Sequence, residues 1–297
     1  INGQMRLCMI PLRVSARYAF FSALATSFIG GLTAGLGQGF DLGTEWPGPV
    51  LTLFLKAVSG SFEPIHRFLT VLTSFLYIAV VVQAVRLRVK RILLLAGLAL
   101  AFLFATAMTG RAVLLVLGGE IKPPLAFAVY PLNNSLALSA ALTMALLWAY
   151  VTPQGTSARP TLFRGAAVWG FVASATGAYI LGYHKIVKEP LQYSLIPSLS
   201  FEELPWALHL AAGFLATLLA VVAVALDSRR GFWHWAALLS ALAQPATGIF
   251  MFFGASADPW APGIQTAFHA AFAHLLVISA FVIYAKSRFG GRWTSPT

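Results

Sequence analysis

The sequence predicts an all-α membrane protein whose chain crosses the bilayer eight times. Of its 297 residues, 59% are hydrophobic and only 10% are charged, whereas a soluble domain carries about a quarter charged residues. Apolar stretches of roughly the 20 residues that cross a bilayer recur from end to end. The connecting segments also alternate between basic and acidic, which gives the direction of the spans. The chain has no room for a sizeable soluble domain.

Proline, glycine and clusters of charge divide the chain into its apolar segments. Backbone polar groups must be paired inside lipid, so each segment is predicted to be a helix. The N-terminal region lacks a small-residue cleavage pattern, so no removed signal peptide is predicted, and Met5 is a candidate natural start. The predicted spans are 16–38, 62–85, 92–117, 124–151, 162–183, 204–226, 232–254 and 263–285.

The charges of the connecting segments predict the orientation of the protein. One set holds 14 basic residues and a single acid, Asp227, whereas the other holds four basic and eight acidic residues. The positive-inside rule then places both termini in the cytoplasm, N-in and C-in. The net charge of +11 is therefore a topology signal, and no nucleic-acid partner is expected. The basic set is Arg6, Arg13, Arg17, Arg86, Arg88, Lys90, Arg91, Arg159, Arg164, Arg229, Arg230, Lys286, Arg288 and Arg292.

The two halves of the chain, 1–157 and 158–297, repeat the same features in the same order. The second span of each half opens with acid and His, "FEPIHR" against "FEELPWALH", and the third carries a Thr-Gly pair, "AMTG" against "QPATG". Each half holds four spans, so the repeat is predicted to be parallel. We therefore expect two four-helix bundles, whose cores are places where cofactors are held.

Four of the six histidines lie within predicted spans, where an ionisable side chain is costly and marks a functional candidate. His209 and His269 occupy matching depths near the outer ends of their helices. Two neutral imidazoles that face each other suit the axial positions of a heme iron. Zinc fits less well, because no third ligand is near in sequence. The alternative is two histidines that hydrogen-bond to backbone or hydroxyl groups.

The remaining histidines are given lesser roles. His184 is expected in an outer loop and His234 at a cytoplasmic helix start, both solvated or interfacial. His274 follows His269 by five residues, which turns it about 140° around the helix. It is therefore expected to pack, or to support a ligand, rather than to bind the same group.

The first half repeats the histidine pattern only in part. His66 is the counterpart of His209, but counting from Thr109 or from Pro124 places Pro131 opposite it, and proline cannot bind iron. Asn133 and Asn134 are nearby, weaker candidates. A heme with one open side can bind oxygen or a reactive group, whereas one with two strong ligands transfers electrons.

Two charged residues stand beside His66. Glu63 lies one turn before it on the same helix face, where a carboxylate could move protons, orient His66 or stabilise a cation. The alternative is an ion pair between Glu63 and Arg67. The planar guanidinium of Arg67 could equally hold a heme propionate.

These residues resemble the heme A synthase family over nearly the whole chain. The likeness rests on "GGLTAGLGQG" and "TEWPGP" within 30–49, "EPIHR" at 63–67, "TGAY" at 176–179, and the two second-half histidines. It implies an enzyme that oxidises the C8 methyl of heme O to a formyl group. It also implies a heme b between His209 and His269, which passes electrons, and a substrate-heme site with catalytic Glu63 and His66.

The chain departs from the family pattern in two places, because Pro131 replaces the fourth His and the outer-loop cysteine pair is absent. A divergent heme A synthase is the first expectation. The alternative is a non-catalytic cytochrome, or a subunit of a respiratory complex, and a third possibility is a transporter without heme. The expected location is the plasma membrane of a prokaryote, with heme sites near the outer leaflet. Expected partners are the bilayer, a terminal oxidase, a heme O synthase or further copies of this chain.

Overall fold

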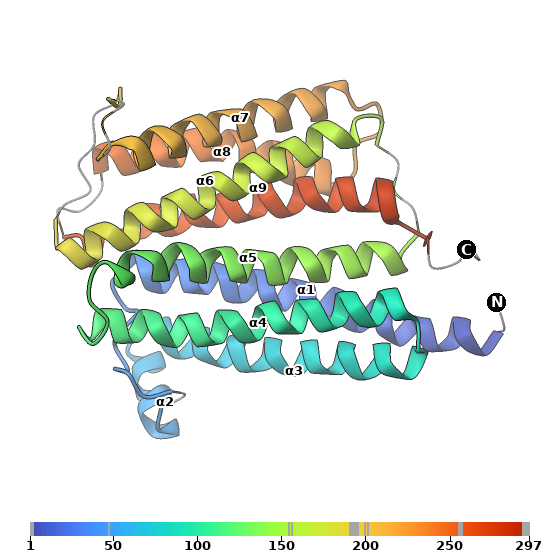
Figure 1. Ribbon diagram of the computed structural model, residues 1–297, viewed down its shortest axis with the longest axis horizontal. Helices are drawn as coiled ribbons and strands as arrows, with labels where there is room; N and C mark the ends of the chain where they lie inside the picture. The colour runs from blue at the N-terminus through green and yellow to red at the C-terminus, as the bar shows by residue number, and fades with distance from the viewer. Residues whose placement is uncertain are drawn as a thin grey trace.

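The computed structural model describes residues 3–46, 48–153, 155, 157–189, 196–198, 200, 202–254 and 258–292. Pro47 of the TEWPGP motif and the side chains of Met5, Arg6 and Cys8 lie outside this description. The described part of the chain forms nine helices and no strand (Figure 1). The helices are α1 (Gly3–Gly35), α2 (Val50–Val58), α3 (Glu63–Leu87), α4 (Lys90–Leu117), α5 (Leu125–Val151), α6 (Pro160–Val187), α7 (Leu204–Leu226), α8 (Phe232–Gly254) and α9 (Ile264–Phe289).

Eight of these helices are long and apolar enough to cross a membrane, and each overlaps one of the predicted spans. The prediction of an all-helical, multi-pass membrane protein is therefore confirmed. The largest difference is at α1, which begins at Gly3 instead of near residue 16 and contains Pro11. Its apolar portion, Pro11–Gly35, is the part that qualifies as a span.

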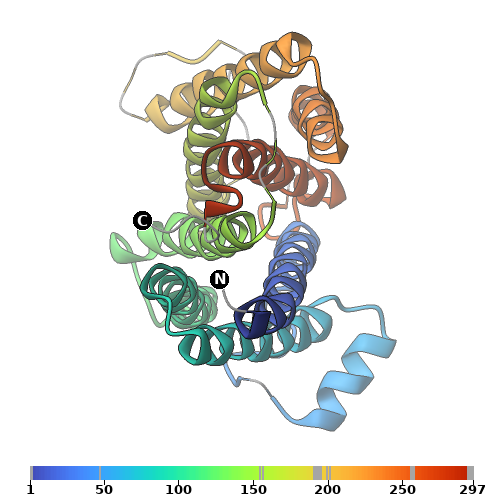
Figure 2. The same cartoon turned by 90° about the vertical axis from the view of Figure 1, so that its right-hand side faces the viewer.

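The long helices pack in two groups of four, which Figure 2 shows nearly end-on. In the first group, each of α1, α3, α4 and α5 contacts two neighbours in a ring, and α6, α7, α8 and α9 form a ring in the same order. The groups meet where α1 and α5 contact α9 and where α5 contacts α6. Of all the spans, α5 and α9 are the most buried, because they lie at this junction.

Small residues allow the close approach of helices at the junction. A Cβ atom on Gly35 of α1 would lie only 2.8 Å from the carbonyl oxygen of Gly263, just before α9. Likewise, a Cβ atom on Gly182 of α6 would meet the ring of Tyr130 on α5 at 2.7 Å. Lipid is as apolar as leucine, so helices in a membrane associate through such tight packing and through polar links.

The short helix α2 stands apart from the two groups (Figure 2). Its nine residues would rise only about 14 Å, too little to cross a bilayer. None of its side chains is buried, and Figure 1 shows it running across the direction of the long helices, at the end opposite both termini. The sequence did not predict this helix, and its place beside α3 puts it next to the "EPIHR" stretch.

Candidate functional site

His209 of α7 and His269 of α9 face each other inside the second group of helices. Their ring centroids are 6.0 Å apart and the ring planes are inclined by 58°. Both side chains are half-buried. The structure therefore brings together the two residues that the sequence predicts as a ligand pair, across a gap between two helices that are not neighbours in the chain.

Helix α6 holds the ring of His209 from one side. The Nδ1–H of His209 donates to the carbonyl oxygen of Ala173 at 2.9 Å. A Cβ atom on Gly177, one turn further along α6, would lie 2.9 Å from Cε1 of His209, so only glycine leaves room for the ring. The indole of Trp206 stacks on the same ring, 5.8 Å away between centroids. Because Nδ1 carries the proton, Nε2 of His209 keeps its lone pair.

Helix α8 holds the ring of His269 in a similar way. Nδ1 of His269 lies 3.1 Å from Oγ1 of Thr247, and the hydroxyl proton of Thr247 is donated to the carbonyl oxygen of Ala243. The hydroxyl oxygen therefore accepts from Nδ1–H, and Nε2 of His269 also keeps its lone pair. Gln244 Nε2 donates to the carbonyl oxygen of His269 at 2.6 Å, which fixes this turn of α9.

The pair fits a metal held by two imidazoles. Hydrogen bonds that occupy Nδ1 leave Nε2 as the ligand atom, as in most protein metal sites with histidine. A metal about 2 Å from each ring nitrogen requires the ring centroids to be about 6 Å apart, which matches the observed separation. Among the described residues no three His, Cys, Asp or Glu side chains are grouped for a metal ion. A two-imidazole site suits heme iron, whose ring supplies the other four ligands.

His66 of α3 has the same kind of support in the first group of helices. Its Nδ1–H donates to the carbonyl oxygen of Thr26 on α1 at 3.0 Å. A Cβ atom on Gly30, one turn further along α1, would lie 2.8 Å from Cε1 of His66. Thr26 and Gly30 thus do for His66 what Ala173 and Gly177 do for His209. Nε2 of His66 keeps its lone pair as well.

Asn133 of α5 contacts the Thr-Gly pair of α4, which makes it the first-group counterpart of His269. Thr109 Oγ1 donates to Oδ1 of Asn133 at 3.0 Å, and a Cβ atom on the neighbouring Gly110 would lie 3.6 Å from the same oxygen, in ordinary contact. Thr247 and Gly248 contact His269 at the matching place, although there the hydroxyl accepts instead of donating. By these contacts the counterpart of His269 is Asn133, two residues after the Pro131 that the count predicted. An amide stands at this position, which is a much weaker metal ligand than imidazole.

Glu63 and Arg67 form a buried ion pair, as the alternative interpretation of the sequence predicted. Arg67 Nη2 is 2.5 Å from Glu63 Oε1, and the two residues are only 4% and 3% exposed. The other carboxylate oxygen of Glu63 accepts from the backbone N–H of Leu42 at 3.0 Å. Arg67 also donates to the carbonyl oxygens of Gly43 and Glu45. The pair therefore fastens the 42–45 loop to the start of α3.

This arrangement directs the Glu63 carboxylate toward the loop. No hydrogen bond between Glu63 and His66 is found among the described residues, although the two share one turn of α3. The catalytic role of Glu63 and the propionate-binding role of Arg67 stay predictions. What the structure adds is that the nitrogen atoms of the guanidinium already serve Glu63 and two carbonyl groups.

A chain of hydrogen bonds joins the two groups of helices beside these sites. Ser27 of α1 is 2.6 Å from Nδ1 of His274 on α9, and Nε2 of His274 is 2.9 Å from Oδ1 of Asn134 on α5. Asn134 Nδ2 donates to Ser174 of α6 at 2.9 Å. Ser27 and Ser174 directly follow the residues whose carbonyl groups hold His66 and His209. Both ring nitrogens of His274 are thus engaged by α1 and α5, and its supporting role stays a prediction.

The two remaining histidines are more buried than predicted. His184 lies in the last turn of α6, not in a loop, and its Nδ1 is 3.0 Å from the carbonyl oxygen of Glu189. His234 does lie at the start of α8, but it is only 8% exposed because Nε2 pairs with Asp227 at 3.3 Å. Among the contacts of the described residues, none joins His184 or His234 to His209 or His269.

Sequence reasoning gave Asn133 and Asn134 too little weight. The matched Thr-Gly pairs could have identified Asn133 if they had been taken as residues that contact the facing side chain, and not only as the point from which to count. Lys185 was also missed: this residue is 6% exposed, and its Nζ donates to the carbonyl oxygens of Ala34 and Trp260, both at 2.8 Å. Its place near the end of a predicted span hid its burial.

Comparisons with known proteins add no relative, because no protein-family model matches the chain and a search of curated proteins finds no match. The resemblance to a known family therefore rests on the sequence motifs alone.

Proposed function

We propose that this protein is a heme-binding membrane oxidoreductase that holds a heme b between His209 and His269. The observation that carries the proposal is that a neighbouring helix engages Nδ1 of each ring, which leaves Nε2 for a metal, at a ring separation that one metal fits. A heme with two histidine ligands supplies one-electron transfer. The residues of α6 and α8 fix the tautomer and the orientation of the two ligands.

We further propose that the first group of helices takes heme O as substrate, as a heme A synthase would, and yields heme A. His66 is supported like a heme ligand by Thr26 and Gly30. Asn133, the counterpart of His269 in this group, leaves one side without a strong ligand. The Glu63–Arg67 pair positions the start of α3 and closes the 42–45 loop beside His66. Substrate oxidation at the C8 methyl belongs to this side of the molecule.

The heme b proposal is tested by replacing each ligand separately. His209→Ala and His269→Ala are expected to remove the low-spin heme spectrum of the purified protein, because neither leaves a second imidazole. His66→Ala is the matched control, since it removes an equivalent histidine from the other half and should spare that spectrum. An unchanged low-spin spectrum in either second-half variant would refute the ligand assignment.

The enzymatic proposal is tested by co-expression with a source of heme O, followed by extraction and chromatography of the hemes. Heme A is expected from the wild-type chain and not from His66→Ala. Glu63→Gln should lower heme A formation and leave the low-spin heme in place. Folded protein that carries heme b but forms no heme A would overturn the enzymatic proposal and leave the heme b proposal standing.

A non-catalytic cytochrome, or a subunit of a respiratory complex, is the second candidate. Asn133 in place of a histidine and the engagement of Glu63 by Arg67 favour it. It predicts a single low-spin heme b per chain, insensitive to carbon monoxide. A second heme that binds carbon monoxide would count against it, because an open axial side is what the synthase-like site requires.

The finer architecture belongs to the same proposal. The matching supports of His66 and His209 favour a parallel repeat of two four-helix bundles, 1–157 and 158–297. With both termini in the cytoplasm, the histidine sites lie near the outer leaflet of a prokaryotic plasma membrane. A heme O synthase and a terminal oxidase are then the partners that supply the substrate and receive the product. Association of several copies of the chain fits the same scheme.

A further inference from the structure

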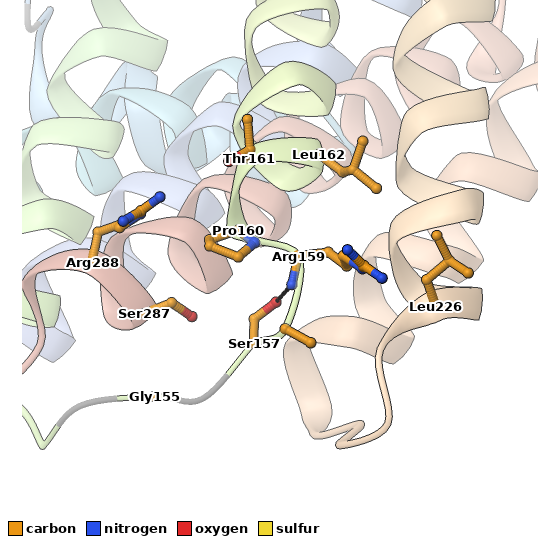
Figure 3. A pocket seen from close by; sticks show the side chains of 10 residues that line it. Gly155, Ser157, Arg159, Pro160, Thr161, Leu162, Leu226, Ser287 and Arg288 are labelled. Atoms are coloured by element: carbon orange, nitrogen blue, oxygen red, sulfur yellow. Dashed lines mark hydrogen bonds between the residues drawn. The ribbon is translucent and has the colours of Figure 1, made fainter.

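A hollow opens at the end of the molecule that carries both termini, far from the histidine sites. It lies where the start of α6 meets the ends of α7 and α9 and has a volume of about 830 Å³. Figure 3 shows Arg288 of α9 on one side of Pro160, and Arg159 on the other, with Leu226 of α7 beyond. The proposed function uses none of these residues.

Two arginines of the hollow, Arg159 and Arg288, have no acidic partner among the described residues. Arg159 and Arg288 are both exposed, and neither guanidinium has a hydrogen bond or an ion pair with the rest of the described chain. No acidic residue is among the described residues that line the hollow. Two arginines in one concave place can bind the oxygens of a phosphate group through their planar forks.

Asp227, the acid predicted on this side, does not line the hollow but is bonded to its rim. Its carboxylate accepts hydrogen bonds from Ser157 Oγ at 2.5 Å and from the backbone N–H of Ala158 at 3.4 Å, and it pairs with His234. Burial alone raises the pKa of this carboxyl, but the hydrogen bonds outweigh burial and leave the pKa below its ordinary value. The carboxylate is thus occupied in fixing the 157–158 turn at the rim of the hollow.

The rest of the lining is mixed in the way that a lipid requires. Thr161 and Ser287 add hydroxyl groups on the polar side of the hollow. Leu162 of α6 and Leu226 of α7 form its apolar side. Leu226 is 54% exposed. A headgroup phosphate could meet the arginines while its acyl chains run along these leucines. Basic pockets between membrane helices on the cytoplasmic side bind anionic lipid headgroups in this way.

We propose that this hollow binds the phosphate headgroup of an anionic phospholipid, held by Arg159 and Arg288. The site is independent of the heme proposal, since it shares no residue with either histidine site. It sits at the end that the charge pattern assigns to the cytoplasm, where anionic lipids attract basic residues.

The test uses native mass spectrometry of the full chain in detergent, titrated with phosphatidylglycerol or with phosphatidylcholine. Wild-type protein is expected to retain one phosphatidylglycerol in preference to phosphatidylcholine. The double variant Arg159→Gln/Arg288→Gln is expected to bind phosphatidylglycerol about 30-fold more weakly. The matched control is Arg86→Gln/Arg91→Gln, which removes two exposed charges at the α3–α4 turn, also at this end. Neither residue lines the hollow, so the affinity for phosphatidylglycerol should change less than about 3-fold, as is typical for exposed charges.

Each outcome decides the proposal. Equal weakening in both double variants would show a general effect of charge and overturn the site, and so would tight binding by Arg159→Gln/Arg288→Gln. A competition with millimolar glycerol phosphate or inorganic phosphate separates lipid from soluble ligands. Failure of both to displace phosphatidylglycerol supports a lipid site, whereas displacement would assign the hollow to a free phosphate ester. Circular dichroism of each variant checks that the helices are retained.

Discussion

The central feature at the scale of single residues is that three histidines share one protonation pattern. His66, His209 and His269 each donate through Nδ1 to an oxygen on a neighbouring helix. A ring that donates through Nδ1 presents an unprotonated Nε2, which is the form that binds a metal. For His66 and His209 the partner is a carbonyl oxygen, which cannot donate. For His269 the partner is the hydroxyl of Thr247, whose own proton goes to the carbonyl oxygen of Ala243. The oxygen atoms that accept from Nδ1 can therefore be tested by substitution, as the histidines can.

Thr247→Val should weaken the heme site without removing a ligand. Valine keeps the shape of threonine but loses the hydroxyl that accepts from His269. Loss of such an outer hydrogen bond costs about 10- to 100-fold in metal affinity, so heme retention during dilution should fall by that factor. Thr109→Val, which removes the partner of Asn133 in the first half, is the matched control and should leave the low-spin heme intact. Equal losses in the two variants would contradict this role.

Gly177→Ala should displace the ring of His209. The added methyl group would lie 2.9 Å from Cε1, closer than real Cβ contacts allow, so the ring must turn away from its partner. We expect loss or strong broadening of the low-spin absorption bands, with the helical circular dichroism unchanged. Gly213→Ala on α7, where a Cβ meets open space, is the control and should behave as wild type. A normal spectrum from Gly177→Ala would mean that His209 does not hold a heme in this position.

At the scale of helices, the connection lengths explain which site residue the sequence could not place. His269 is the sixth residue of α9, whereas Asn133 is the ninth residue of α5. A count from the Thr-Gly pair or from the preceding proline assumes equal connections, and it stops at Pro131. The Glu63–Arg67 pair, in contrast, was accessible to sequence reasoning, because residues four apart on a helix are neighbours. A contact between residues one helical turn apart was predictable. The alignment of the two halves was not, because their connections differ in length.

The hydrogen bond between His274 and Asn134 should show coupling between α9 and α5. His274→Leu and Asn134→Leu each leave one polar group of the 2.9 Å contact without its partner, whereas the double variant removes both. Hydrogen bonds between membrane helices contribute about 0.6 kcal/mol on average and up to about 1.7 kcal/mol. We therefore expect the double variant to lose less stability than the sum of the single variants. Thermal unfolding in one detergent measures this, and strictly additive losses would refute the coupling.

Asp227 should make the junction of the α5–α6 and α7–α8 connections sensitive to acid. Its pKa is lowered in the folded protein by the hydrogen bonds that it accepts. A lowered pKa stabilises the fold at pH values above the unfolded pKa of about 4, and this stability is lost as the pH falls through the folded pKa. Asp227→Asn should be less stable by about 1 to 2 kcal/mol at pH 7 and should lack this part of the acid loss. Glu120→Gln, at an exposed position, is the control. If the stability of Asp227→Asn and of the wild type depended on pH in the same way, Asp227 would not be a source of the acid sensitivity.

At the scale of the whole molecule, composition alone was enough to predict most of the fold. Seven of the eight long helices begin and end within four residues of the predicted spans, because apolar length is fixed by the bilayer. The start of α1 was not predictable, since a helix can continue beyond its apolar part. Helix α2 was missed because nine residues are too short for a span. The packing of α1 on α9 and of α5 on α6 depends on glycines whose contacts are defined only by the folded structure.

The orientation of the whole molecule is the remaining prediction, and it is open to direct labelling. Both termini and the α3–α4, α5–α6 and α7–α8 connections lie at one end (Figure 1). The predicted excess of basic residues at that end places it in the cytoplasm. In a Cys8→Ser background, Glu120→Cys should react with a membrane-impermeant maleimide on intact cells. Arg229→Cys should react only after the membrane is opened, since both positions are exposed and differ in side alone. The reverse labelling pattern would show that the protein has the opposite orientation, with the histidine sites near the inner leaflet.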